Sequence, residues 1–104
     1  MSNSTFLEEL QAIIRQRLAD APAGSYTARL AREGVLKVAQ KVGEEGVEPA
    51  LAAAAQDRAH VVAEAADLLY HLLLLLELRE LPIGDVVTEL ERRHSAKTSL
   101  APDS

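Results

Sequence analysis

The feature that most constrains the fold is the stretch 58–78, which is apolar on almost every side of a helical wheel. Ala, Val and Leu fill it, apart from a narrow polar stripe that holds Glu64, Asp67 and His71. A helix with so little polar surface is buried on most of its sides. Its five-leucine run is far shorter than the ~20 apolar residues of a membrane span. We therefore expect the buried central helix of a helical domain.

Two clusters of carboxylates share one helical spacing. Glu45 and Glu48 are three residues apart, as are Glu64 and Asp67, and fifteen residues separate the two clusters. Residues at this spacing lie on one helix face, with Cβ atoms about 5–6 Å apart. If the two helices fold back on each other, four carboxylates converge and repel one another unless a cation binds. Because an all-oxygen ligand set favours a hard ion, we predict a Mg²⁺ site at these four residues.

A plainer interpretation stays open for part of this pattern. Glu44, Glu45 and Glu48 fit a solvated helix face, and Lys41 stands four residues before Glu45, where a simple ion pair forms. Glu64 and Asp67 differ, because they interrupt the most apolar helix. An unpaired buried carboxylate costs several kcal/mol, so either a metal or a basic side chain must face them.

The remaining candidates are a histidine and a set of basic residues. His71 follows Asp67 by four residues, so we expect a core histidine hydrogen-bonded to that carboxylate, with direct metal ligation as the alternative. Lys37 and Lys41 extend the acidic stripe and are candidates for binding phosphate oxygens, as is Arg29, for which solvent exposure is the alternative. Arg93 ends a helix, where its charge favourably meets the macrodipole; contact with phosphate or a partner is the bolder interpretation.

Composition narrows the class of protein. The chain has 104 residues, which suits a single domain, with a core at about 5–95 and a polar tail at 96–104. Hydrophobic residues make up 48% but aromatic ones only 3%, so we expect a core of Leu, Val and Ala in helices. The net charge of -5 disfavours nucleic-acid binding. The absence of cysteine excludes thiolate metal sites and fits a cytoplasmic location.

Periodicity and capping residues predict an all-α bundle of four to five helices. Ser4 or Thr5 is expected to cap the first, Ser25 the second and Asp57 the fourth. A kink or one-turn irregularity is expected at Pro49, because its ring clashes with the carbonyl four residues back. The five predicted helices span 5–19, 26–33, 35–55, 58–78 and 82–94.

Four blocks of the sequence occur in the order typical of one family. They are Ser25-Tyr26-Thr27-Ala28, Gln40-Lys41-Val42-Gly43-Glu44-Glu45, Ala66-Asp67-Leu68-Leu69-Tyr70-His71 and Glu89-Leu90-Glu91-Arg92-Arg93-His94. Together they resemble the phosphoribosyl-ATP pyrophosphatases of histidine biosynthesis, which belong to the all-α nucleoside triphosphate pyrophosphatases with the MazG-like enzymes. The resemblance covers roughly residues 5–95. Pro49 departs from it, since the family more often has an aliphatic residue there.

The resemblance implies hydrolysis of phosphoribosyl-ATP to phosphoribosyl-AMP and pyrophosphate with Mg²⁺, in a stand-alone homodimer. It implies that Glu45, Glu48, Glu64 and Asp67 hold the metal and that Lys37 and Lys41 grip phosphates. The expected catalytic residues are Glu44, Glu45 and Lys41, with Glu44 orienting or deprotonating water or helping a second ion. Arg29, His71 and Arg93 are further candidates for binding the substrate. Two alternatives remain: a related pyrophosphatase of other nucleoside triphosphates, and a non-catalytic helical dimerisation module.

Overall fold

The fold is entirely α-helical. The computed structural model describes residues 3–20, 24–55 and 57–95, and these ranges hold helices but no strand. The expectation of an all-α fold is thereby confirmed. The helices are α1 (Asn3–Asp20), α2 (Tyr26–Arg32), α3 (Val35–Ala55), α4 (Arg58–Leu78) and α5 (Ile83–His94).

Two of the predicted N-caps are present in the structure. The Ser25 hydroxyl accepts a hydrogen bond from the Ala28 amide at 3.1 Å, and Asp57 Oδ1 accepts one from the His60 amide at 2.9 Å. Each bond satisfies an amide that the first helical turn leaves free. The cap predicted for the first helix is wrong, because α1 begins at Asn3 and Ser4 lies inside it.

Pro49 does not interrupt α3. The helix is continuous from Val35 to Ala55 with Pro49 inside it, so the predicted one-turn irregularity is absent. A proline in a helix loses one backbone hydrogen bond, the one its amide would donate to Glu45. A helix of this length retains its other backbone bonds and its packing against α4, which explains why the local rule fails here.

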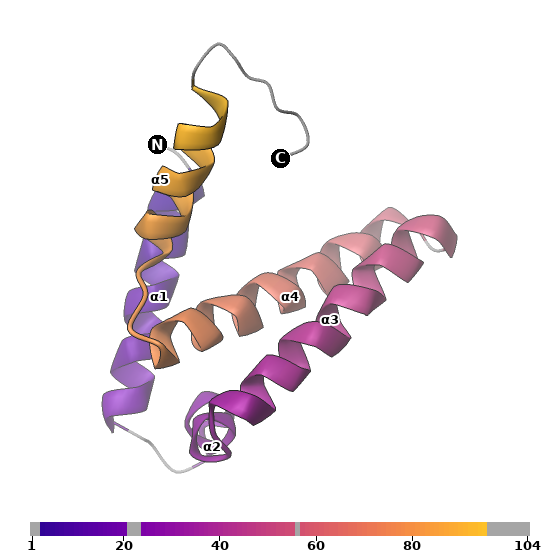
Figure 1. The fold of residues 1–104 in the computed structure, drawn as a ribbon. Helices are drawn as coiled ribbons and strands as arrows, with labels where there is room; N and C mark the ends of the chain where they lie inside the picture. The colour runs from indigo at the N-terminus through magenta and orange to yellow at the C-terminus, as the bar shows by residue number, and fades with distance from the viewer. Residues whose placement is uncertain (1–2, 21–23, 56, 96–104) are drawn as a thin grey trace.

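The two long helices, α3 and α4, make the most extensive contact among the described helices and lie side by side (Figure 1). α1 and α2 pack on α4 near its C-terminal end, and α5 packs along α1. The core lies where these helices meet. It consists of side chains from all five helices: Ile14, Leu30, Val38, Leu73, Leu74 and Ile83.

A buried glutamine and a helix cap fix the connection between α4 and α5. Gln11 Nε2 donates to the Leu81 carbonyl at 2.9 Å, while its Oε1 accepts from the Ile83 amide at 2.7 Å. Beside it, Glu80 adopts a positive φ of 60°, and the Leu81 amide donates back to the Leu76 carbonyl. This is a Schellman cap, which reverses the chain after α4 and directs α5 back along α1.

The opposite end of the α3–α4 pair has a different surface. We call α3 from residue 44 onward and α4 up to residue 67 the arm. Val47, Leu51 and Val62 lie on it and are 56%, 62% and 64% exposed. The expectation that the fourth helix is buried on most sides is therefore wrong for its N-terminal half in the single chain. Its fully buried side chains lie in the C-terminal half, at His71, Leu73 and Leu74.

Of the helices in the described ranges, none combines the length and apolarity that crossing a membrane requires.

Candidate functional site

Three carboxylates from two helices converge at the base of the arm. Glu45 of α3 and Glu64 and Asp67 of α4 each offer an oxygen, and these oxygens lie within 4.8 Å of one another. Glu64 and Asp67 share a face of α4 because they are three residues apart, and the packing of α3 on α4 brings Glu45 to them. We call these three residues the carboxylate cluster.

The negative charge of the carboxylate cluster is only weakly compensated by neighbouring basic side chains. Glu45 Oε1 is buried and has no hydrogen-bond partner among the described residues. Its other oxygen lies 3.8 Å from the Lys41 ammonium, and Glu64 lies 3.7 Å from the exposed His60 ring. These contacts exceed hydrogen-bond length. A buried carboxylate oxygen without a partner is costly, so the donor set fits a hard cation.

The other two predicted acidic residues lie apart from this convergence. Glu48 is exposed on α3 and is not one of the three clustered carboxylates. Glu44 is also exposed and accepts a hydrogen bond from Gln40 Nε2 at 3.2 Å. The structure therefore brings together three of the four predicted metal ligands, while Glu48 remains a prediction from spacing.

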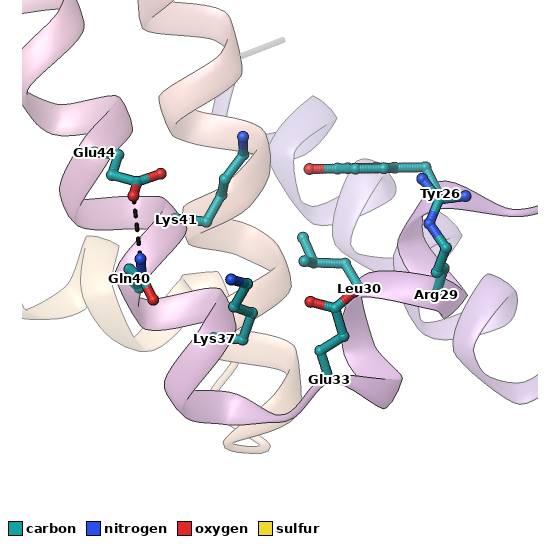
Figure 2. Close-up of a pocket in the computed structure, with 8 residues that line it drawn as sticks. All are labelled: Tyr26, Arg29, Leu30, Glu33, Lys37, Gln40, Lys41 and Glu44. Atoms are coloured by element: carbon teal, nitrogen blue, oxygen red, sulfur yellow. Dashed lines mark hydrogen bonds between the residues drawn. The ribbon is translucent and has the colours of Figure 1, made fainter.

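A pocket of about 250 Å³ opens between α2 and α3 (Figure 2). One wall comes from α2 and its C-terminal cap and consists of Tyr26, Arg29, Leu30 and Glu33. The facing wall comes from the first half of α3, where four residues along one stripe point into the pocket: Lys37, Gln40, Lys41 and Glu44. Three basic side chains against two acidic ones suit an anionic ligand.

Lys41 joins the pocket to the carboxylate cluster. It lines the pocket, and its ammonium is also the nearest cation to Glu45. In Figure 2 the Lys37 and Lys41 side chains extend from neighbouring turns of α3, on the side that faces α2. The spacing of four residues explains this, because it returns a side chain to the same helix face. A negative group in the pocket would thus lie beside a cation bound at the carboxylates.

His71 is buried. It does not line the pocket, and it is not one of the three residues of the carboxylate cluster. Its Nδ1 lies 2.9 Å from the Asp67 carbonyl oxygen, and its Nε2 lies 2.6 Å from the Tyr26 hydroxyl. The predicted partner, the Asp67 carboxylate, is wrong: the ring binds the backbone of that residue. An i,i+4 spacing on a helix allows either contact, and sequence alone does not separate them.

Arg93 lies on α5 and does not line the pocket. Its Nε donates to Glu89 at 3.0 Å, and Arg92 donates to the same carboxylate at 2.6 Å. The hydrogen bonds from Arg92 and then Arg93 lower the pKa of Glu89 from 4.5 to about 2. The structure thus accounts for Arg93 by an ion pair on its own helix, and its role toward a substrate remains a prediction.

The site prediction did not include four of the residues that line the pocket: Tyr26, Leu30, Glu33 and Gln40. Of these, Tyr26 is the aromatic one. It is one of only two tyrosines and begins α2 three residues before Arg29, so helical spacing could have placed both on one face. The Arg29 guanidinium carbon lies 5.6 Å from the centroid of the Tyr26 ring, within the range of a cation–π contact.

Fold and site together define a class. In this all-α fold a carboxylate cluster suited to a cation adjoins a basic pocket suited to an anion, and α3 contributes residues to both. Such a pairing is what an enzyme needs to bind a phosphorylated compound together with a metal ion.

Comparison with known proteins identifies the family. Residues 7–94 match the phosphoribosyl-ATP pyrophosphohydrolase family, so the chain belongs to it. The resemblance seen in the sequence is confirmed, and with it the prediction of an enzyme of this class.

Similar proteins include both short and long forms. A phosphoribosyl-ATP pyrophosphatase of Pyrobaculum aerophilum is 58% identical over 83% of this chain and 92% of its own length. One from Novosphingobium aromaticivorans is 46% identical over 89% and 87%. A histidine biosynthesis bifunctional protein of Xanthomonas campestris pv. campestris is 53% identical over 88% of this chain, which spans only 44% of that protein.

Proposed function

We propose that this chain hydrolyses phosphoribosyl-ATP to phosphoribosyl-AMP and pyrophosphate, an early step of histidine biosynthesis. The observation that carries the proposal is Lys41, which lines the basic pocket and lies 3.8 Å from Glu45 of the carboxylate cluster. The names of the short relatives support the choice of substrate.

Mg²⁺ is the proposed cofactor, held by Glu45, Glu64 and Asp67, with Glu48 one turn along α3 as a fourth ligand. The partnerless buried Oε1 of Glu45 supports this, since a cation would satisfy it. When bound, the ion supplies concentrated positive charge beside the phosphoanhydride.

The side chains of the pocket bind the phosphates and accept the proton of water. Lys37, Lys41 and Arg29 bind phosphate oxygens and stabilise the negative charge that grows on them as the anhydride breaks. A water oxygen bonds to phosphorus, the α–β bridging P–O bond breaks, and pyrophosphate leaves. Glu44 accepts a proton from the attacking water, a task that its exposed carboxylate at the pocket edge can perform.

A second copy of the chain is the proposed partner of the arm. Val47, Leu51 and Val62 are each more than half exposed, and exposed apolar side chains gathered in one region commonly mark a protein interface. We also propose a cytoplasmic location, which suits an enzyme that makes an amino acid.

The decisive experiment measures pyrophosphate release from phosphoribosyl-ATP, with and without Mg²⁺, beside a panel of ordinary nucleoside triphosphates. Metal-dependent turnover confined to phosphoribosyl-ATP is the expected result. Turnover across the panel would indicate a broader nucleoside triphosphate pyrophosphatase. No turnover by correctly folded protein would leave a helical dimerisation module.

A further inference from the structure

Two adjacent polar pairs hold the pocket helix α2 against α4. The Tyr26 hydroxyl contacts His71, and the Thr27 hydroxyl contacts the Tyr70 hydroxyl. Thr27 and His71 are 2% and 7% exposed, Tyr70 is half-buried, and Tyr26 is 40% exposed. Consecutive residues of α2 thus meet consecutive residues of α4. Both pairs hold α2 on α4, but of the two tyrosines only Tyr26 lines the pocket.

The hydrogen-bond directions in the first pair follow from its acceptors. A carbonyl oxygen only accepts, so His71 Nδ1 must carry the proton that is donated to Asp67. In the neutral ring, Nε2 then has no hydrogen and accepts the proton of the Tyr26 hydroxyl. The two rings meet edge to face, with centroids 5.7 Å apart and planes at 84°. Tyr26 is therefore held both at its hydroxyl and along its ring.

What Tyr26 fixes is the charged wall of the pocket. Its ring lines the pocket, and the Arg29 guanidinium lies 5.6 Å from the ring centroid. Figure 2 shows the ring edge-on, with its hydroxyl directed away from Arg29. Anchoring the hydroxyl therefore sets the plane of the ring against which the guanidinium rests. His71 links this hydroxyl to the carboxylate cluster, because its other ring nitrogen is hydrogen-bonded to the backbone carbonyl of Asp67.

We propose that Tyr26 and His71 are positioning residues for the basic pocket. The pair holds the pocket wall, and Arg29 on it, at a fixed place relative to the carboxylate cluster, so that a substrate's phosphates are held beside the metal ligands. This assignment rests on the proposed function for the identity of the substrate. His71 then acts through Tyr26 and touches no substrate atom, which its burial requires.

The chain offers a matched pair of variants to test this. Tyr26→Phe and Tyr70→Phe each delete one hydroxyl from the same α2–α4 contact and leave the ring in place, but only Tyr26 lines the pocket. Tyr26→Phe is expected to raise KM for phosphoribosyl-ATP roughly fivefold to tenfold, the value of one hydrogen bond, with kcat within about twofold. Tyr70→Phe should lower Tm about as much as Tyr26→Phe does, but should leave KM for phosphoribosyl-ATP within about twofold of the wild-type value.

Variants of His71 provide a rescue. His71→Gln keeps an acceptor that can reach the Tyr26 hydroxyl, whereas His71→Leu removes it. A wild-type-like KM in His71→Gln and a raised KM in Tyr26→Phe would support the proposal. Equal KM in Tyr26→Phe, Tyr70→Phe and the wild type would overturn it, whatever the Tm values, and would leave the contact as simple packing.

A binding measurement separates this proposal from the proposed function. If wild-type protein does not hydrolyse phosphoribosyl-ATP, the proposed function fails, and calorimetric titration with inorganic pyrophosphate replaces the kinetic assay. Weaker pyrophosphate binding by Tyr26→Phe than by Tyr70→Phe would still support the positioning pair. Equal binding by both variants, or no binding by the wild type, would overturn it.

Discussion

The two halves of α4 differ in composition and in burial: the N-terminal half is rich in Ala and Val, and the C-terminal half is rich in Leu. At the C-terminal end, Leu73 and Leu74 are at most 1% exposed and belong to a core cluster that also includes side chains of α1, α2, α3 and α5. At the N-terminal end, Val62 is 64% exposed, with only α3 alongside among the described helices. The first end holds the domain together. The second end carries the carboxylate cluster and an apolar surface that the single chain leaves uncovered.

This difference separates residues that stabilise the fold from residues that are costly to it. The core end satisfies its polar groups, as Gln11 does by bonding two backbone groups of the α4–α5 connection. In the arm, Glu45 Oε1 is buried and has no hydrogen-bond partner in the part of the chain that the structure describes. Uncompensated groups of this kind are expected at functional sites, because the cost is met elsewhere in the fold.

The largest expected effect is on activity, at the arm. Asp67→Asn removes one charge from the carboxylate cluster and should lower kcat/KM by about a thousandfold, or ~4 kcal/mol of transition-state stabilisation, if the cluster holds the metal. Steady-state pyrophosphate release measures this. Glu77→Gln is the control, since it removes a carboxylate from the core end of the same helix, where Glu77 binds Arg15.

Two outcomes would break this comparison. Comparable losses of activity in Asp67→Asn and Glu77→Gln would show that the carboxylate cluster contributes no more to catalysis than a carboxylate at the core end of α4. A loss of Mg²⁺ dependence without any loss of rate in Asp67→Asn would remove Asp67 from the metal site.

The next effect is on stability, at the core. Leu74→Ala opens a cavity at a fully buried position and should lower the free energy of unfolding by about 3 kcal/mol. Val62→Ala should change it by less than about 0.5 kcal/mol in dilute protein, since Val62 is exposed and Ala favours helix. Urea unfolding followed by circular dichroism measures both.

Protein concentration sharpens this second comparison. If the arm pairs with a second copy, the cost of Val62→Ala should grow as protein concentration rises, while that of Leu74→Ala stays constant. A Val62→Ala effect that is independent of concentration, in protein that sediments as a monomer, would contradict the proposed dimer.

A smaller effect, on substrate binding, is expected in the pocket between α2 and α3. Lys37→Ala removes one of three cations and should raise KM for phosphoribosyl-ATP about tenfold with little change in kcat, since a hydrogen bond to a charged group is worth about 1.5 kcal/mol. Arg92→Ala, which removes a cation from α5 outside the pocket, is the control. A tenfold change in kcat with unchanged KM would instead assign Lys37 to the chemical step.

The sequence predicted most of the local structure, because local rules govern it. Ser25 and Asp57 cap their helices as their chemistry requires, and α4 ends at Leu78 as expected. The i,i+3 spacing placed Glu64 and Asp67 on one face, and the hairpin of two long helices brought Glu45 to them. The polar tail predicted at 96–104 lies outside the described residues.

Tertiary contacts explain what the sequence did not predict. Packing of α3 on α4 outweighs the local cost of Pro49, so the helix continues through it. The contact of His71 with Tyr26 joins residues 45 apart in the chain, and no periodicity encodes such a pairing. The N-terminal half of α4 was predicted to be buried, because a hydrophobic pattern does not reveal which chain covers it.

The smallest expected effect lies on the surface of the core end, at Glu89. Hydrogen bonds from Arg92 and Arg93 lower its pKa from 4.5 to about 2, so its contribution to stability is complete above pH 4.5 and is lost as the pH falls through about 2. Glu89→Gln should therefore lower Tm slightly at pH 6, by much less than Leu74→Ala, because exposed ion pairs are strongly screened. The Tm difference between wild type and Glu89→Gln should shrink as the pH is lowered from 4.5 toward 2. A difference that persists unchanged at pH 2 would mean that Glu89 stabilises α5 by something other than its charge.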